Sequence, residues 1–320
     1  MPSYSESLLL KNVFLALTYR TANFPSTLHQ CGYDEVYIEK AFTNSQLKHV
    51  RYDFAASAPA RNRSVLLEVK GGQYTRPEEQ RRLQQQVQRY AAVTGEDVVQ
   101  KAGFSVAPGL DPRQHEPQSF VVGIEGQMDG IMAVIPASTS IPLLEARVDT
   151  ADVTYGGAVI VQGSCTDPQL AAHLGALPRM YPIPTTLPFD LESRDIDIAD
   201  AIVPVILQLF YRLPSVTTFR TQDVIEQAIP IWPLIDADEQ RSYLGRVRRI
   251  LGDLAAHGFR GWFEWDNGGR QWRIMQSLGQ VHAERMRTFR RLQSLQHQAL
   301  GRLGGGHLQQ ATLPLDGDEP

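Results

Sequence analysis

Acidic and basic side chains stand at the ends of two short apolar runs in the first third of the sequence. Asp53 belongs to an alternating run over residues 50–54, and Glu68 and Lys70 end the apolar run that follows. Side chains two positions apart on a strand point to the same face of a sheet, so we expect Glu68 and Lys70 to lie together. Residues 55–63 contain a proline and polar side chains, which suits a hairpin. The pattern therefore predicts a carboxylate on each of two adjacent strands.

These residue types predict a metal-dependent hydrolase. Carboxylate oxygens are hard ligands, and Mg²⁺ commonly binds one or two of them together with waters and phosphate oxygens of a substrate. A lysine beside such an ion can orient or help to deprotonate the attacking water, and it can stabilise negative charge on a phosphate. We therefore predict that Asp53 and Glu68 bind Mg²⁺, with Mn²⁺ as a substitute, and that Lys70 acts on the water or the phosphate.

A helix is predicted directly after these two strands. It begins at Pro77, followed by two glutamates, which is typical of a first helical turn. It runs to about residue 93 and ends near Gly95. Gln86 and Tyr90 lie four residues apart within it, so they share one face of the helix.

In this order, the elements resemble the PD-(D/E)XK nuclease superfamily, whose core has a strand with Asp, a strand with Glu-x-Lys and a following helix. Asp53 matches the first acid, although Tyr52 replaces the usual preceding proline. Glu68-Val69-Lys70 matches Glu-x-Lys in full, and Gln86-x-x-x-Tyr90 is similar to a Gln-x-x-x-Tyr element in several branches. The resemblance implies an endonuclease that cuts DNA, of the restriction or phage-defence type.

The resemblance also implies residue roles. Lys70 would position the attacking water, Gln86 would hold Lys70, the water or the phosphate, and Tyr90 would buttress the helix. Many members carry a further metal-facing glutamate on an upstream helix, and here a predicted helix over residues 33–42 offers Glu35 or Glu39. Both remain candidates, beside the interpretation that they are exposed helical glutamates.

Other interpretations of the same residues remain. Asp53, Glu68 and Lys70 could form the polar face of a solvated hairpin, because acids opposite lysines are common cross-strand pairs. A second set, Asp129 with Glu145 and Arg147, repeats the spacing. No Gln-x-x-x-Tyr helix follows it, and arginine does not accept a proton, so we rank this set below the first.

Composition sets broad limits on the protein. The 320 residues are enough for two domains, and 42% hydrophobic with 21% charged residues is typical of a soluble globular protein. No run approaches the roughly 18 apolar residues of a membrane-spanning helix, and the start lacks the pattern of a signal peptide. Cys31 and Cys165 show no metal-ligand spacing. We therefore expect a cytoplasmic protein that does not bind membranes.

The second half of the sequence has a helical period followed by a hairpin signal. Asn267-Gly268-Gly269 is a strong turn between two short apolar runs. Three helices followed by such a hairpin are typical of a winged helix-turn-helix. The predicted elements are helices over residues 198–213, 221–228 and 236–257, and strands over 259–264 and 270–274.

We thus predict an α/β protein with a restriction-endonuclease-like core, a mixed sheet with flanking helices, followed by a winged-helix domain. A nuclease domain before a winged helix is also similar to some restriction endonucleases, although this chain has no cysteine cluster for a structural zinc. The predicted division is a nuclease-like domain over residues 1–165, a linker or long loop over 166–195, a winged helix over 196–276, a C-terminal helix over 277–303 and a disordered tail over 304–320.

DNA contacts require local basic patches, because the net charge is −4. The candidate arginines lie on the third helix and in the wing, and the C-terminal helix could mediate a homodimer or bind a protein partner. An alternative is that these arginines pair with acids on the helix surface, and that the chain is a non-catalytic DNA-binding or assembly protein with a nuclease-like core. The candidates are Arg241, Arg246, Arg248, Arg249, Arg270 and Arg273.

Overall fold

The computed structural model describes residues 5–20, 23–70, 74–136, 138–211 and 217–275, together with residues 290, 294 and 298. The chain divides into two compact units. The larger unit contains residues 3–190 and 229–242, and the smaller contains residues 191–228 and those from 243 onward. Apart from residues 290, 294 and 298, the predicted C-terminal helix and tail fall outside the described residues.

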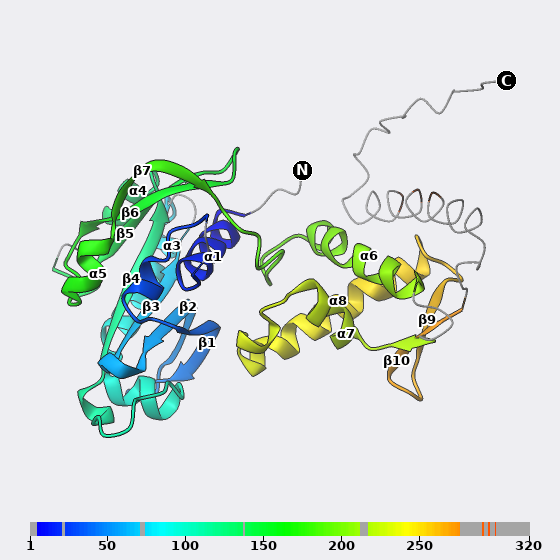
Figure 1. Cartoon of the computed structure of the whole chain (residues 1–320), viewed down its shortest axis with the longest axis horizontal. Helices are drawn as coiled ribbons and strands as arrows, with labels where there is room; N and C mark the ends of the chain where they lie inside the picture. The colour runs from blue at the N-terminus through cyan, green and yellow to red at the C-terminus, as the bar shows by residue number, and fades with distance from the viewer. Residues whose placement is uncertain are drawn as a thin grey trace. The chain divides into compact units, whose positions relative to one another are not determined.

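A mixed sheet of seven strands forms the centre of the larger unit (Figure 1). Its strands lie side by side in sequence order. The pairs β1–β2 and β2–β3 are antiparallel, and the pairs β3–β4 and β4–β5 are parallel. The pairs β5–β6 and β6–β7 are again antiparallel. The strands are β1 (Glu35–Thr43), β2 (His49–Ala58), β3 (Arg63–Val69), β4 (Glu116–Ile124), β5 (Leu143–Asp149), β6 (Thr154–Gln162) and β7 (Gly175–Pro182).

Helices flank this sheet, which confirms the predicted α/β class with a mixed sheet (Figure 1). Helix α1 packs on β2 and β3, and α3 packs on β2 and β4. The helices are α1 (Glu6–Leu17), α2 (Thr27–Gln30), α3 (Pro77–Ala91), α4 (Met128–Met132) and α5 (Pro168–His173), and the short turns are η1 (Pro59–Arg61), η2 (Asp97–Lys101), η3 (Pro112–Gln114) and η4 (Trp232–Leu234).

The two longest helices of this unit bury very different amounts of side chain. Helix α1 is apolar nearly all round, and every side chain from Leu8 to Leu17 is buried. Ser5 caps it by accepting a hydrogen bond from the Leu8 N–H at 3.1 Å. Helix α3 is amphipathic: it buries Leu83, Val87 and Tyr90 and turns its arginines outward. Because α1 is fully covered, any polar side chain on it must find its partners inside the protein.

Strand β2 contacts both helices through neighbouring aromatic rings. The Tyr52 ring stacks on Tyr90 of α3, with centroids 4.5 Å apart, whereas the Phe54 ring packs against Phe14 of α1 at 5.9 Å. Residues two apart on a regular strand share a face, so the alternation of β2 is interrupted at Asp53. Glu39, level with Asp53 on β1, has a φ of 55°. Such irregularities change the direction in which side chains point. This one lies where Glu39 of β1 is opposite Asp53 of β2.

Three predicted elements differ from the structure. Residues 33–42 are predicted to form a helix, yet β1 covers residues 35–43, because pairing with β2 outweighs the weak helical period. The short apolar run over residues 130–135 predicts a strand, yet α4 covers Met128–Met132. The predicted linker over 166–195 contains α5 and β7. Asp167 fixes this segment, since its carboxylate accepts hydrogen bonds from Tyr33 and Arg61 at 2.8 and 2.7 Å.

The smaller unit contains helices and a three-stranded antiparallel sheet in the order β8-β10-β9. Trp272 of β10 packs against Phe219 and Phe263, and its indole N–H donates to the Thr221 hydroxyl at 3.1 Å. The predicted helices over 221–228 and 236–257 and the predicted hairpin turn are present, whereas the first strand of the hairpin begins at Phe263 instead of residue 259. The predicted helix over 198–213 begins earlier, at Asp195, and its last two residues lie outside the described residues. Its elements are α6 (Asp195–Tyr211), β8 (Thr218–Phe219), α7 (Thr221–Ala228), α8 (Ala237–Ala256, which begins in the larger unit), β9 (Phe263–Asp266) and β10 (Gln271–Ile274).

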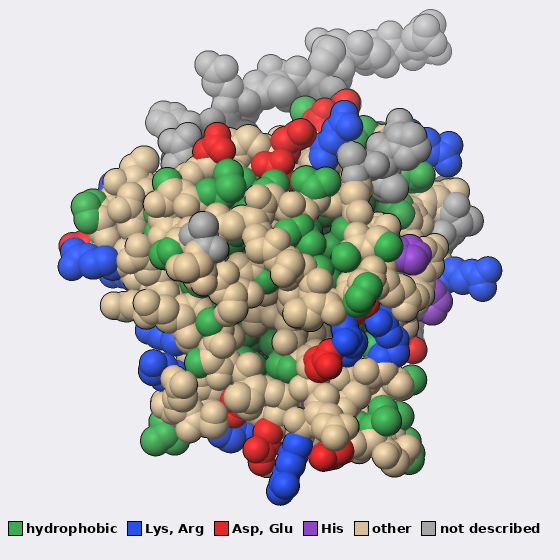
Figure 2. Space-filling model, turned by 90° about the vertical axis from the view of Figure 1, so that its left-hand side faces the viewer, with side chains coloured by type: hydrophobic (Ala, Val, Ile, Leu, Met, Phe, Trp, Pro, Cys, Tyr) green, Lys and Arg blue, Asp and Glu red, His purple; other side chains and the backbone are tan. Residues whose placement is uncertain are grey.

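Among the described residues, no helix is both long enough and apolar enough to cross a membrane. The face of the molecule in Figure 2 carries lysine and arginine side chains interspersed with aspartate and glutamate. It has no broad basic field, which agrees with a net charge of −4. On this face, any attraction for a polyanion must therefore come from smaller groups of cations.

A buried histidine gives the fold a predicted sensitivity to acid. His115 joins the start of β4 to β3 through contacts of its ring nitrogens with Asn62 at 3.0 Å and Ser64 at 2.9 Å. Burial lowers the pKa of His115 from 6.5 to about 4. The unfolded chain therefore binds the proton more tightly, and stability present above pH 6.5 is lost as the pH falls toward 4. We expect a loss of about 2–3 kcal/mol from this group.

The measurement is urea unfolding followed by circular dichroism at several pH values between 7 and 4. The loss attributed to His115 should disappear in His115→Gln and persist in His173→Gln, because His173 is an exposed histidine on α5. Identical pH dependences in wild type and His115→Gln would contradict the assignment.

Candidate active site

The register of β2 and β3 brings the two predicted metal ligands together. Phe54 pairs with Leu67, so the next position along each strand places Asp53 beside Glu68. One Asp53 carboxylate oxygen, Oδ2, accepts a hydrogen bond from the Val69 N–H at 2.8 Å. Both acids are mostly buried, with 15% of the Asp53 side chain and 7% of the Glu68 side chain exposed. The predicted placement of two carboxylates on adjacent strands is thus confirmed.

Glu68 is surrounded by donors from β3 and α3. Lys70 Nζ and Gln86 Nε2 donate to Oε1, the latter at 2.6 Å, and the Tyr90 hydroxyl lies 2.6 Å from Oε2. The Tyr90 hydroxyl also lies 2.5 Å from the Arg51 carbonyl oxygen, so its single proton serves one of the two acceptors at a time. Helix α3 therefore delivers Gln86 and Tyr90 to the carboxylate, one helical turn apart.

Burial and neighbouring charges shift the pKa values of Glu68 and Lys70. Burial raises the pKa of Glu68 to about 7, and the Asp53 charge adds to this while Lys70 and Tyr90 oppose it. For Lys70, burial would lower the pKa, but the Glu68 carboxylate more than offsets it, so the pKa is raised. Lys70 is therefore an ammonium at neutral pH in this arrangement, which favours a role as hydrogen-bond donor and positive charge over a role as base.

A second lysine, absent from the predicted set, lies on the other side of Asp53. Lys11 of α1 has only 1% of its side chain exposed, and its Nζ lies 2.6 Å from Glu39, 3.1 Å from Asp190 and 3.3 Å from Asp53 Oδ1. Burial would lower the pKa of Lys11, but these three carboxylates raise it well above its usual value. Its signal in the sequence is a lysine in the middle of the apolar run of α1.

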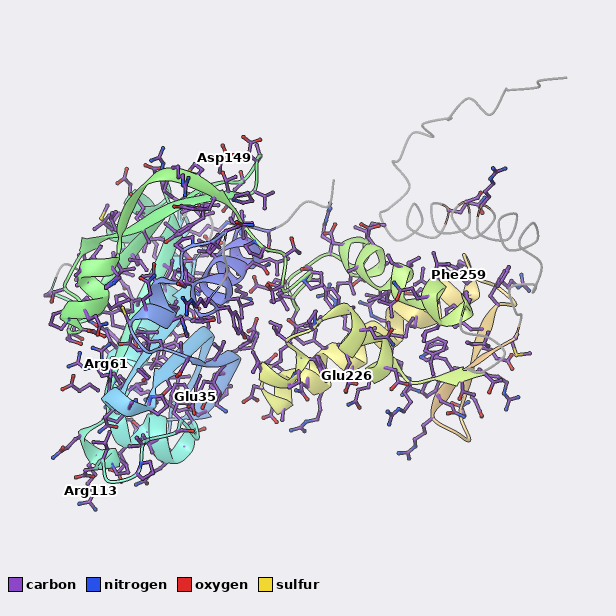
Figure 3. All side chains as sticks on the ribbon, in the orientation of Figure 1. Glu35, Arg61, Arg113, Asp149, Glu226 and Phe259 are labelled. Atoms are coloured by element: carbon purple, nitrogen blue, oxygen red, sulfur yellow. The ribbon has the colours of Figure 1, made fainter. Side chains whose placement is uncertain are left out.

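The two glutamates considered upstream of Asp53 have different surroundings. Glu39 is fully buried, contacts Lys11 and accepts a hydrogen bond from Arg51 Nε at 3.0 Å. Glu35 lies four residues earlier on β1, about 13 Å along the strand (Figure 3). There it pairs with Ser57 and accepts a hydrogen bond from Tyr37. Neither lies on a helix, and Glu39 is the one near Asp53.

The lower-ranked set does not converge. Asp129 lies on helix α4, Glu145 lies on β5, and within the described part of the chain no ion pair or hydrogen bond joins them. The carboxylate closest to Arg147 is that of Glu125, at 4.0 Å.

The donor set around Asp53 fits a cation that takes much of its coordination from solvent. In the described ranges, no group of three or more His, Cys, Asp or Glu side chains is arranged to hold a metal ion. Two adjacent carboxylates are nevertheless what Mg²⁺ uses together with waters and substrate oxygens. Carboxylates also outnumber cations around Asp53, which favours a bound metal cation. The carboxylates are those of Glu39, Asp53, Glu68, Asp190 and Glu239, and the cations are Lys11, Arg51 and Lys70.

The arginines predicted to contact DNA have different partners in the structure. Arg246 donates to the Leu191 and Ser193 carbonyl oxygens and to Asp195, which ties α8 to the start of α6. Arg248 lies over the Trp265 ring at 4.0 Å, and Arg270 occupies the β9–β10 turn with a φ of 49°. The remaining three pair with carboxylates: Arg241 with Asp238, Arg249 with Asp195 and Arg273 with Asp266.

Residues 7–113 match the family model described as the MJECL32 domain. This stretch runs from α1 to η3 and contains Lys11, Glu39, Asp53, Glu68, Lys70, Gln86 and Tyr90. The chain is thus similar to that family over the whole of the candidate site apart from Asp190 and Glu239. No curated protein and no solved structure matches the chain.

The buried position of Lys11 leads to a prediction about stability. Lys11→Met removes one ammonium and leaves three carboxylates without it, and breaking a buried ion pair on one side costs about 3–5 kcal/mol. Lys40→Met is the matched control, because Lys40 forms a more exposed pair with Asp236 at 3.3 Å. It should cost about 1 kcal/mol or less. Urea unfolding at pH 7 measures both, and equal losses would contradict the structural role given to Lys11.

Proposed function

We propose that this protein is a metal-dependent endonuclease that hydrolyses phosphodiester bonds of DNA, of the restriction or phage-defence type. The observation that carries the proposal is the meeting of Asp53, in the middle of β2, with Glu68 and Lys70 at the end of the adjacent β3, with Gln86 and Tyr90 of α3 on Glu68. The same residues in the same chain order carry the resemblance to PD-(D/E)XK nucleases.

Asp53 and Glu68 would hold Mg²⁺ or Mn²⁺, which supplies Lewis-acid stabilisation of the phosphate and lowers the pKa of a bound water. The residues around them set the positions of these carboxylates. The Val69 N–H and Lys11 fix the two oxygens of Asp53, while Gln86 and Tyr90 fix those of Glu68. Lys11 is thus a positioning residue, because it acts through Asp53.

Lys70 is the group best placed to act on the reactants. Its ammonium is held beside Glu68, in a largely buried site where a charge acts strongly. From there it would donate a hydrogen bond to the attacking water or to a non-bridging phosphate oxygen, and it would oppose the negative charge that develops during cleavage. A DNA strand that approaches this site brings its own negative charge to an area where carboxylates already outnumber cations, and a bound cation would reduce this repulsion.

The test is cleavage of methylated and unmethylated plasmid DNA with Mg²⁺, with Mn²⁺ and with EDTA. We expect cutting that requires a divalent cation and falls by about 10²- to 10⁴-fold in Lys70→Ala and Glu68→Gln. Lys48→Ala is the control, since Lys48 is an exposed lysine in the β1–β2 turn. The pattern of bands on the two plasmids gives the sequence and methylation requirement.

Each outcome of this experiment has a definite meaning. Cutting by Lys70→Ala at the wild-type rate, in protein with a wild-type circular dichroism spectrum, would overturn the assignment. DNA binding without cutting of any substrate would instead favour the alternative, a non-catalytic DNA-binding or assembly protein. One observation favours that alternative: both carboxylate oxygens of Glu68 already have protein donors.

We also propose that the C-terminal elements form a winged helix that binds DNA. The order helix, strand, helix, helix, strand, strand and the three-stranded antiparallel sheet support it, as does the tight turn at residues 267–270. Arg248 and Arg270 are the cations best suited to phosphate. Within the described residues neither has a carboxylate within 4.0 Å, and Trp265 holds the Arg248 guanidinium at the protein surface.

This assignment predicts which arginines affect DNA affinity. Replacement of Arg248 and Arg270 by glutamine should weaken binding, and it should lower the slope of log K against log salt concentration by about 1 for each phosphate that is no longer bound. Arg273→Gln should change little, because Arg273 pairs with Asp266 in the same sheet. Fluorescence anisotropy over a salt series measures both. A larger effect of Arg273→Gln than of the double replacement would reverse the assignment.

A further inference from the structure

A second cationic feature lies beside the candidate active site, on the outer side of α3. It is a pocket of about 270 Å³ between the first residues of β2 and the exposed face of α3. Every residue that lines it belongs to the larger unit. Its polar lining comes from His49, Arg51, Arg82, Gln85, Gln86 and Arg89. A hollow lined by three arginines is suited to an anion rather than to an apolar ligand.

The spacing of the arginines on α3 places them on one stripe of the helix. Arg82, Gln86 and Arg89 follow one another at intervals of four and three residues, and Leu83, Val87 and Tyr90 turn to the core. Gln86 therefore stands between two exposed guanidinium groups, each about one helical turn, or about 5.4 Å, away along the axis.

An ordinary solvated helix surface would pair these arginines with nearby acids. Glu78 and Glu79 lie one turn before Arg82, yet in the described part of the chain no carboxylate comes within 4.0 Å of Arg82 or Arg89. Arg51, by contrast, is bound to Glu39 and has Glu239 at 3.4 Å. The pocket thus combines two uncompensated guanidinium groups with a third that is fixed in place.

The pocket and the candidate active site share the side chain of Gln86. Gln86 lines the pocket, and its amide donates to Glu68 and to the Tyr90 hydroxyl, both at 2.6 Å. When the scissile phosphate of a strand lies at Asp53, Glu68 and Lys70, the phosphates one or two nucleotides away lie next to this site. The pocket is also next to this site, because Gln86 belongs to both. Arginine binds phosphate oxygens with two parallel N–H donors, which suits it to hold such a group.

We propose that this pocket binds a second phosphate group of the nucleic-acid strand that is cut, and so fixes the strand relative to the reacting bond. The proposal rests on the proposed nuclease function. The phosphate is either an internal phosphodiester or a terminal phosphate of the strand, because both present the same oxygens to the arginines. An internal phosphodiester would make the site part of endonucleolytic cutting, and a terminal phosphate would make it a sensor of strand ends.

The experiment measures binding of the full chain to a short fluorescent oligonucleotide in EDTA, where no cleavage occurs. Arg82→Gln with Arg89→Gln should weaken binding by about 10- to 100-fold. It should also lower the salt slope by about 1 if the two arginines share a phosphate, or by about 2 if each holds its own. Arg81→Gln is the matched control, because Arg81 is an exposed arginine of the same helix outside the pocket.

Oligonucleotides with and without a terminal phosphate distinguish the two sources. A loss of affinity in the double variant that is equal on both supports an internal phosphodiester, and a loss confined to the phosphorylated strand supports a terminal phosphate. If the double variant binds both strands with the affinity and salt slope of Arg81→Gln, the phosphate site is overturned. Absence of binding by wild type to either strand overturns it as well.

Failure of this inference is distinguishable from failure of the proposed function. If Lys70→Ala abolishes metal-dependent cutting while the arginine variants bind and cut like wild type, the nuclease stands and the phosphate site falls. If wild type cuts no DNA but the double arginine variant loses binding, the phosphate site stands and the chain is a nucleic-acid-binding protein.

Discussion

The cost of removing carboxylates from water governs the architecture of this site. Glu39 and Asp190 are fully buried and Asp53 is mostly buried, and an unpaired charge away from water is strongly unfavourable. Lys11 meets all three at once. Three segments far apart in the sequence, α1, β1 and the residues after β7, are therefore held to one point. The orientation of Asp53 is set by this junction at Oδ1 and by the Val69 N–H of the hairpin at Oδ2.

Glu68 belongs to a different kind of environment. Its charge is disfavoured by burial and by Asp53, and it is supported by Lys70, Gln86 and Tyr90. Ligands of metal ions must be deprotonated, so a cation and a proton compete for such a carboxylate. The donors on α3 decide this competition in part, because they favour the ionised form. Helix α3 thus contacts Glu68 through Gln86 and Tyr90 and presents its arginines to solvent.

Much of the site was predictable because its parts are local. Asp53, Glu68 and Lys70 lie on one hairpin, and Gln86 lies on the next helix, so strand and helix periods alone place them. Lys11, Glu39 and Asp190 come together only through the tertiary fold, and no spacing in the sequence relates them. Residues 33–42 have apolar positions that fit a helix or a strand, and pairing with β2 decides between the two. Residues 166–195 contain five prolines, a composition typical of a linker, and those on β7 are tolerated because β7 is an edge strand.

The arginines show a second limit of prediction from sequence. Whether an arginine is available to bind a phosphate depends on whether it already pairs with a carboxylate, and the sequence does not show this. Arg246 and Arg248 are two residues apart on α8, yet Arg246 is occupied by two carbonyl oxygens and Asp195 while Arg248 rests on an indole ring. Only a cation without a carboxylate gains by meeting a phosphate, because a paired one must first give up its partner. In a chain with a net charge of −4, the distribution of such cations identifies the surfaces that attract an anion.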